Sequence, residues 1–122
     1  MEYTAAVAWD VEFTVEFNEW WQELTASEQG DLTAGVELLM ERGPHLGYPY
    51  SSGVNGSRHG HMRELRVQSG GKPLRVFYAF DPLRSAILLI GGGKTGDSQF
   101  YERYIHTADR LYDEHLLELR KG

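Results

Sequence analysis

Two arginines and a glutamate near the middle of the chain have the residue types and spacing for phosphate chemistry. They lie in the segments 63–67 (RELRV) and 74–78 (LRVFY), in which polar and apolar residues alternate. Alternation with a period of two predicts strands, with Glu64 and Arg66 on one strand face and Arg75 on the corresponding face of the next. An antiparallel register that brings the apolar faces together therefore also brings the two arginines together.

With Val67 facing Leu74, we expect Arg66 and Arg75 to be direct cross-strand neighbours. Like charges in that position destabilise a sheet by roughly 0.2–1 kcal/mol, so they need an offset such as Glu64 or an anionic ligand. The alternative interpretation is a solvated sheet face on which Glu64 is simply the partner of both arginines.

The distribution of charge supports a phosphate-binding surface more than the net charge of −6 does. Residues 57–96 hold seven Lys or Arg and two Asp or Glu, whereas residues 1–56 hold one basic and ten acidic residues. A local basic patch is the feature that contacts phosphates. Besides Arg66 and Arg75, the candidates for phosphate contacts are Arg58, Arg63 and Lys72.

A glycine-rich segment, 91–96 (GGGKTG), lies between an expected strand and an expected helix. The phosphate-binding P-loop requires a glycine five positions before Gly93, and Leu88 occupies that position, so we exclude a nucleotide-hydrolysing P-loop. Backbone amides of Gly92 and Gly93 at a helix start could still bind a phosphate, with Lys94 adding charge. The alternative is a flexible turn that only needs positive φ angles.

The elements that must position these residues follow from periodicity and capping signals. The apolar–acidic alternation of residues 9–17 predicts a first strand, although its last residues also suit the helix that follows. Thr25 and Glu28 have capping-box spacing for a helix that Gly43 and Pro44 end. We also expect a short helix at 19–24, an irregular loop at 45–60, strands at 62–68, 74–80 and 85–90, and a long helix capped by Asp97 or Ser98.

Composition limits the other possibilities. The chain has no cysteine, its longest purely apolar run is 86–90, and no basic leader precedes an apolar block. We therefore expect one cytoplasmic domain over residues 1–122 with no membrane partner. His59 and His61 have metal-ligand spacing, but no third ligand follows from the spacing, so no metal site and no cofactor is predicted.

The order of these motifs resembles the RelE/ParE toxin superfamily, and more closely its HigB-like, phage-derived Gp49-like branch. The resemblance covers about residues 9–120. It rests on RELRV, LRVFY and the strand 87–90 (ILLI) with a basic residue after it. Further parts are the Trp20-Trp21 helix, Glu41-Arg42-Gly43-Pro44, Gly56-Ser57-Arg58 and the tail 111–116 (LYDEHL).

The resemblance implies an α+β, microbial RNase-type fold of order βααβββα, with a small, mostly antiparallel sheet, two N-terminal helices and a C-terminal helix. It implies the toxin of a type II toxin–antitoxin pair, which cleaves mRNA in the ribosomal A site without metal as the ribose 2′-hydroxyl attacks the adjacent phosphate. Arg75, Arg66 and Lys94 match the family's catalytic basic positions. The implied partners are the ribosome, mRNA and an antitoxin with a helix-turn-helix DNA-binding domain.

The groups that transfer protons stay open at this level. His61, Glu64, Tyr101 and His106 are candidates because their side chains can exchange protons, and Lys94 could act as a base only after losing one. Two other functions of the same superfamily also stay open. They are a ParE-like inhibitor of DNA gyrase without nuclease activity, and an inactive RelE-fold binding module.

Overall fold

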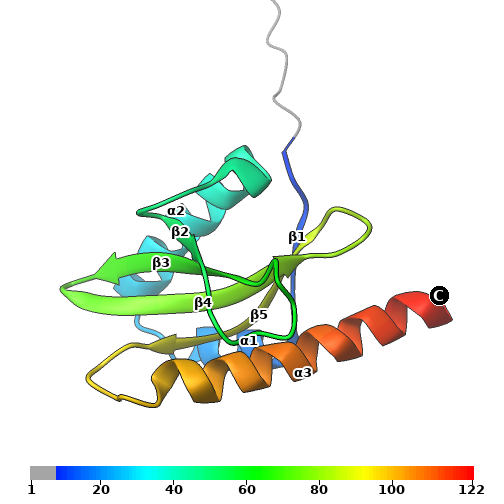
Figure 1. Ribbon diagram of the computed structural model, residues 1–122. Helices are drawn as coiled ribbons and strands as arrows, with labels where there is room; N and C mark the ends of the chain where they lie inside the picture. The colour runs from blue at the N-terminus through cyan, green and yellow to red at the C-terminus, as the bar shows by residue number, and fades with distance from the viewer. Residues whose placement is uncertain (1–7) are drawn as a thin grey trace, which may run out of the picture.

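The structure is a computed structural model that describes residues 8–122. Within these residues, three α-helices and a five-stranded sheet of order β1-β5-β4-β3-β2 form a layered α+β arrangement, and only the β1–β5 pair is parallel. Figure 1 shows α3 crossing one face of the sheet, with its C-terminal turns projecting beyond the strands. The elements are β1 (Val11–Phe13), α1 (Val15–Gln22), α2 (Ala26–Arg42), the 3-10 helix η1 (Gly43–His45), β2 (Ser51–Gly53), β3 (Arg63–Ser69), β4 (Lys72–Phe80), β5 (Ala86–Gly93) and α3 (Phe100–Lys121).

The first strand is much shorter than the alternation of residues 9–17 predicts. It ends at Phe13, because the Thr14 side chain accepts a hydrogen bond from the backbone N–H of Phe17 at 2.9 Å and so caps α1. The Thr14 hydroxyl also donates to the carbonyl of Leu89 at 2.6 Å, which fixes the start of α1 against β5. The helix expected at 19–24 therefore begins at Val15.

Helix α2 begins as its capping box predicts. The Thr25 side chain accepts from the backbone N–H of Glu28, whose carboxylate accepts from the Thr25 N–H in return. The Thr25 N–H, helped by Lys72, lowers the pKa of Glu28. The helix ends at Gly43, which has a φ of 55° and whose missing side chain leaves room for the indole of Trp9, 2.3 Å from an added Cβ. No other residue fits that position.

The sequence predicts an irregular loop at 45–60, but part of this segment has regular structure. It contains the end of η1 and the short strand β2, which pairs antiparallel with β3 so that Ser52 faces Glu64. The Ser51 hydroxyl lies 2.6 Å from that of Tyr78 inside the core. Strand β2 lacks apolar alternation and exists because of this long-range pairing, so periodicity alone could not predict it.

The central hairpin has the predicted register. Val67 pairs with Leu74, and Arg66 lies directly opposite Arg75. Gly70 and Gly71 both have positive φ in the two-residue turn between β3 and β4, as a tight hairpin requires. Local sequence signals therefore predict both the register and the turn of this hairpin, and the structure has both.

Each face of the sheet carries its own apolar core. One core lies under α1 and α2, and its largest fully buried members are Leu32, Leu39, Leu46, Leu65, Leu74, Val76 and Tyr78. The other lies under α3 and includes Met62, Phe77, Ala79, Ile87, Leu89, Phe100, Ile105, Ala108, Leu111 and Tyr112. Because β4 supplies both cores alternately, the α3 face of the sheet is also the face that carries Arg66 and Arg75.

The glycine-rich segment does not lie at a helix start, where the sequence predicts it. Gly91, Gly92 and Gly93 belong to β5 and pair with Val76, Arg75 and Leu74, whereas α3 begins only at Phe100. These glycines therefore do not form an amide cradle at a helix start. A Cβ on Gly91 would lie 2.2 Å from the Trp20 ring, and one on Gly92 would lie 2.5 Å from the Tyr104 ring. The glycines are needed so that aromatic rings can lie against the strand from both faces.

Helix α3 also starts later than expected. Asp97 does not cap it directly: its carboxylate accepts from the N–H of Gln99, and its backbone carbonyl accepts from the N–H of Phe100. The Gln99 N–H, together with the guanidinium of Arg103, lowers the pKa of Asp97. No described helix combines the length and the apolar character that a membrane crossing requires.

The packing against β5 predicts that Gly91→Ala lowers the free energy of unfolding by about 1–3 kcal/mol, because the new methyl group overlaps the Trp20 ring. Urea unfolding measures the effect. Gly30→Ala is the matched control: Gly30 lies in α2 with open space around it, so the same change should stabilise the chain by about 0.5–1 kcal/mol. A neutral effect of Gly91→Ala would contradict this account of the glycines.

Candidate cationic site

Glu64, Arg66, Arg75, Lys94 and Tyr101 come together on the α3 face of the sheet, and we call this group the cationic site. Arg66 and Arg75 are cross-strand neighbours on β3 and β4. The Glu64 carboxylate lies between them, with one oxygen 3.3 Å from Arg66 Nη1 and the other 3.5 Å from Arg75 Nε. One carboxylate thus offsets the repulsion of two guanidinium groups.

Two further hydrogen bonds hold the Glu64 side chain in place. The Tyr101 hydroxyl donates to its Oε1 at 2.7 Å, and the Ser52 hydroxyl donates to its Oε2 at 2.8 Å. Glu64 itself is buried. A buried carboxylate requires such partners, and here they come from β2, β3, β4 and α3 at once.

Arg75 is the most constrained member of the cationic site. Its side chain is 7% exposed, and its Nη1 donates to the carbonyl of Leu74 at 3.0 Å. Its Nε is buried and has no hydrogen-bond acceptor among residues 8–122. A buried guanidinium that shares a single carboxylate with a second arginine is an incompletely neutralised cation, to which an added anion is favourable.

Lys94 joins the site through Tyr101. It directly follows β5, its backbone N–H donates to the carbonyl of Pro73, and its ammonium lies 5.0 Å from the centroid of the Tyr101 ring. Tyr101, in the first turn of α3, thus donates its hydroxyl to Glu64 and presents its ring to the ammonium of Lys94. Two cations therefore contact the Glu64 carboxylate directly, and a third lies over the ring whose hydroxyl bonds to it.

Tyr48 and Ser52 lie beside the cationic site but are not among the residues predicted from the sequence. The Tyr48 ring is 76% exposed, and the Arg66 guanidinium lies 5.2 Å from its centroid. An exposed aromatic ring beside cations is a surface on which a nucleobase can stack. The available signal was the pair of tyrosines in a glycine- and proline-rich segment, GYPYSSG, whose place depends on β2 pairing with β3.

The other basic candidates pair with groups outside the cationic site, although Arg58 lines a hollow together with Tyr101. Arg63 donates to the Ser51 hydroxyl at 2.9 Å, Lys72 pairs with Glu28 on α2 at 3.4 Å, and Arg58 pairs with Asp113 on α3. Arg63 therefore binds to the edge strand β2, and Lys72 binds to α2. RNA contacts at these three residues stay a prediction.

The histidines also lie apart from the arginine pair. His61 lies 3.1 Å from the Tyr112 hydroxyl, and His59 lies 2.8 Å from Asp113, both along the middle of α3. His106 is exposed and lines a hollow of about 460 Å³ with Arg58 and Tyr101. Of the four proton-transfer candidates, the structure brings only Glu64 and Tyr101 together with the arginines.

Burial, with the charge of Asp81 nearby, raises the pKa of Tyr112. Its neutral hydroxyl donates to the Phe80 carbonyl at 2.8 Å and so ties α3 to the end of β4. The His61 and Tyr112 pair is thus part of the packing of α3 on the sheet.

The Asp113 carboxylate should contribute to stability in a pH-dependent way. The His59 side chain, followed by Arg58, lowers the pKa of Asp113 below its ordinary value of 3.8. The contribution is therefore present above that value and is lost as the pH falls through the lowered pKa. Since the side chain is 46% exposed, we expect less than about 1 kcal/mol. Urea unfolding at about pH 2–5 should show a flatter pH dependence for Asp113→Asn than for the parent chain.

Solved structures with the same fold identify the architecture. A free-state structure of the Escherichia coli toxin RelE carrying two arginine-to-alanine substitutions has a TM-score of 0.56 and 14% identity, covering 78% of this chain and 92% of that one. The intact Escherichia coli RelBE toxin–antitoxin complex has a chain with a TM-score of 0.50 and 13% identity, covering 72% of this chain and 99% of that one. The α+β architecture is therefore RelE-like, as the sequence predicted.

Sequence comparison gives the family. The sequence model described as phage-derived protein Gp49-like matches residues 19–113. A Mycobacterium tuberculosis protein that carries the toxin name HigB3 is 38% identical over 108 residues, which cover 88% of this chain and 93% of the relative. Another from the same organism, with the name HigB2, is 46% identical over 87 residues, covering 70% of this chain but only 43% of the relative. The chain belongs to the phage-derived Gp49-like family of the RelE/HigB-like toxin superfamily.

Proposed function

We propose that this protein is the toxin of a type II toxin–antitoxin pair and that it cleaves mRNA on the ribosome at the cationic site. The observation that carries the proposal is the arginine pair itself: Arg66 and Arg75 lie directly opposite each other with one shared carboxylate. A sheet that keeps two guanidinium groups in this position is poised to bind an anion. The resemblance to the RelE/ParE superfamily, which implies mRNA cleavage, supports a phosphodiester as that anion.

In the proposed reaction the RNA supplies the nucleophile, and side chains of the cationic site move the protons and stabilise the charge. The ribose 2′-oxygen forms a bond to the adjacent phosphorus as its proton moves to the Glu64 carboxylate. The bond from phosphorus to the 5′-oxygen of the next nucleotide breaks, and that oxygen takes up a proton. The products are a 2′,3′-cyclic phosphate and a 5′-hydroxyl. Arg66 and Arg75 stabilise the extra negative charge on the phosphoryl oxygens in the transition state.

Glu64 is the base in this proposal because its position between the arginines puts it beside any phosphate they bind. Two neighbouring groups can supply the proton to the leaving oxygen: the hydroxyl of Tyr101 and the ammonium of Lys94. Tyr101→Phe and Lys94→Met distinguish them. The variant that lacks the acid should lose more activity on a natural 5′-leaving group than on an activated one.

The decisive experiment incubates the purified protein with translating ribosomes and maps the ends of the mRNA. We expect cuts within the codon in the ribosomal A site, and loss of these cuts in the double variant Arg75→Ala, Lys94→Ala. Arg110→Ala is the control, since Arg110 is exposed on α3 and pairs only with Glu114 among the described residues.

Absence of cuts by the parent chain, or undiminished cutting by the double variant, would overturn the proposal. A DNA supercoiling assay with gyrase then separates the remaining possibility. A gyrase inhibitor stalls DNA cleavage complexes and leaves mRNA intact, whereas the proposed nuclease leaves supercoiling unchanged.

A further inference from the structure

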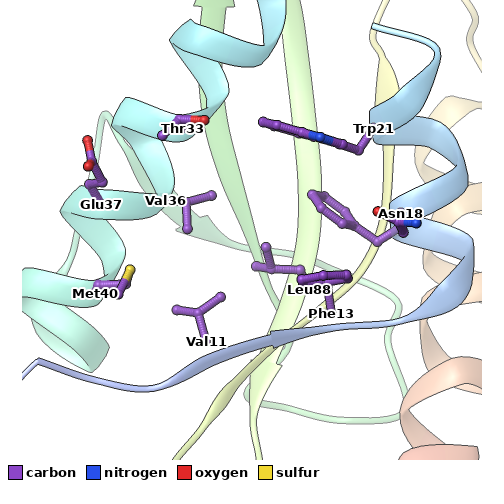
Figure 2. Close-up of a pocket in the computed structure, with 10 residues that line it drawn as sticks. Val11, Phe13, Asn18, Trp21, Thr33, Val36, Glu37, Met40 and Leu88 are labelled. Atoms are coloured by element: carbon purple, nitrogen blue, oxygen red, sulfur yellow. The ribbon is translucent and has the colours of Figure 1, made fainter.

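An apolar groove opens on the opposite face of the sheet from the cationic site. It has a volume of about 480 Å³ and lies between α1 and α2, with Leu88 of β5 as its floor (Figure 2). Trp21 lies on the α1 wall, and Val36 and Met40 form the α2 wall. Phe17, which is also on α1, completes the first wall. No step of the proposed cleavage uses this groove.

One end of the groove is open to solvent along β1. Phe13 lines the groove and is 60% exposed, and its neighbour Val15 is 71% exposed. Strand β1 is also an edge strand of the sheet, with β5 as its one partner strand among residues 8–122. Exposed apolar side chains beside an open strand edge and a preformed groove are typical of a site that binds a segment of another protein.

The charge around the groove selects the kind of partner. Residues 8–42, which include β1, α1 and α2, carry nine Asp or Glu and a single basic residue, Arg42. Within the part of the chain that the structure describes, only Glu28 of these nine acids forms an ion pair. Glu37 lines the groove itself and is exposed. A second copy of this chain would bring the same acidic surface to the groove, which electrostatic repulsion opposes.

We propose that this groove binds a cationic amphipathic segment of the antitoxin, whose apolar side chains fill the groove while its Lys and Arg residues face the acidic rim. The inference rests on the proposed function for the identity of the partner and on the groove for its chemistry. It places neutralisation on the face of the sheet opposite to the arginine pair. The antitoxin segment therefore differs from RNA in where it binds, although each ligand meets a surface of opposite charge.

The first arm of the test needs no antitoxin. It uses two synthetic amphipathic helical peptides with the same leucine face, one with lysines and one with glutamates on the polar face. The lysine peptide should bind the full chain, move the amide resonances of Phe13, Trp21 and Val36, and bind more weakly as salt is added. Equal binding of both peptides, or resonance shifts confined to other surfaces, would overturn the proposal.

Two variants test whether residues of the groove contribute to the affinity for the lysine peptide. Phe13→Asp should weaken binding of the lysine peptide about tenfold or more. Leu117→Asp is its control, since Leu117 is 52% exposed on α3. Glu37→Lys changes only an exposed charge and keeps the test valid even if Phe13→Asp reduces folding.

The second arm uses the protein encoded by the reading frame next to that of the toxin. Phe13→Asp and Glu37→Lys should still cleave mRNA but escape neutralisation in a growth assay, whereas Leu117→Asp should be neutralised like the parent chain. Full neutralisation of both groove variants would overturn the groove proposal and leave the nuclease proposal standing. Absence of cleavage by the parent chain would instead overturn the proposed function, and the peptide arm would still decide the groove.

Discussion

Replacing Arg75 with alanine should lower the rate of mRNA cleavage on the ribosome by about 10²–10³-fold, the usual effect of removing one group that stabilises charge in a transition state. Arg75 is the best-positioned cation of the site, because its side chain is 7% exposed and its place on β4 is fixed by pairing with both β3 and β5. Single-turnover cleavage with saturating ribosome complexes measures the chemical step.

Arg75→Lys separates charge from geometry. Lysine keeps the positive charge but loses the planar fork that contacts two phosphoryl oxygens together, so we expect it to recover only part of the activity. Both variants also alter the ion pair with Glu64, and cleavage must therefore be expressed per folded molecule, with folding checked by urea unfolding. A folded Arg75→Ala protein that cleaves at the rate of the parent chain would remove Arg75 from the mechanism.

The largest effect on stability is expected for Phe77→Ala, which should lower the free energy of unfolding by about 3–5 kcal/mol. Phe77 is 0% exposed, and its ring centroid lies 6.1 Å from that of Phe100 and 6.0 Å from those of Tyr101 and Tyr104. Its removal leaves a cavity between β4 and the first turns of α3, which the rigid strand cannot close.

Equilibrium unfolding in urea measures this loss, and two substitutions calibrate it. Phe77→Leu should cost much less, since it keeps most of the buried volume. Leu117→Ala should change stability by about 0.5 kcal/mol or less, because Leu117 is 52% exposed. Since Phe77 also supports the ring of Tyr101, Phe77→Leu should lower cleavage more than its small effect on stability implies. An unfolding free energy of Phe77→Ala close to that of the parent chain would contradict the packing described here.

Some elements of the structure are predictable because their signals are local. The capping box of Thr25 and Glu28 determines where α2 begins, and the glycines of the β3–β4 turn permit a tight hairpin. Alternation within the hairpin allows only registers that bring Arg66 and Arg75 together. The centre of the cationic site thus follows from the sequence between residues 63 and 78.

Other predictions failed where a contact with a distant residue overrides a local pattern. The alternation after Phe13 indicates a strand, yet Thr14 caps a helix and bonds to Leu89, 75 residues away in the chain. The glycines of β5 look like a phosphate loop, yet they leave space for Trp20 and Tyr104. Such contacts carry no periodic signal, so the sequence alone cannot distinguish them from turns or loops.

The basic centre of this protein, the register that pairs its arginines and its resemblance to a family thus follow from residues close together in the chain. Which proton-exchanging groups meet that centre depends on tertiary packing. Ser52 and Tyr101 reach Glu64 across separations of 12 and 37 residues. The acidic N-terminal third likewise reads as a charged surface in the sequence, and only the packing of α1 and α2 opens an apolar groove within it. The physical reason is the same in both cases: strand alternation is a property of neighbours in the chain, whereas a site or a groove depends on how separate elements pack.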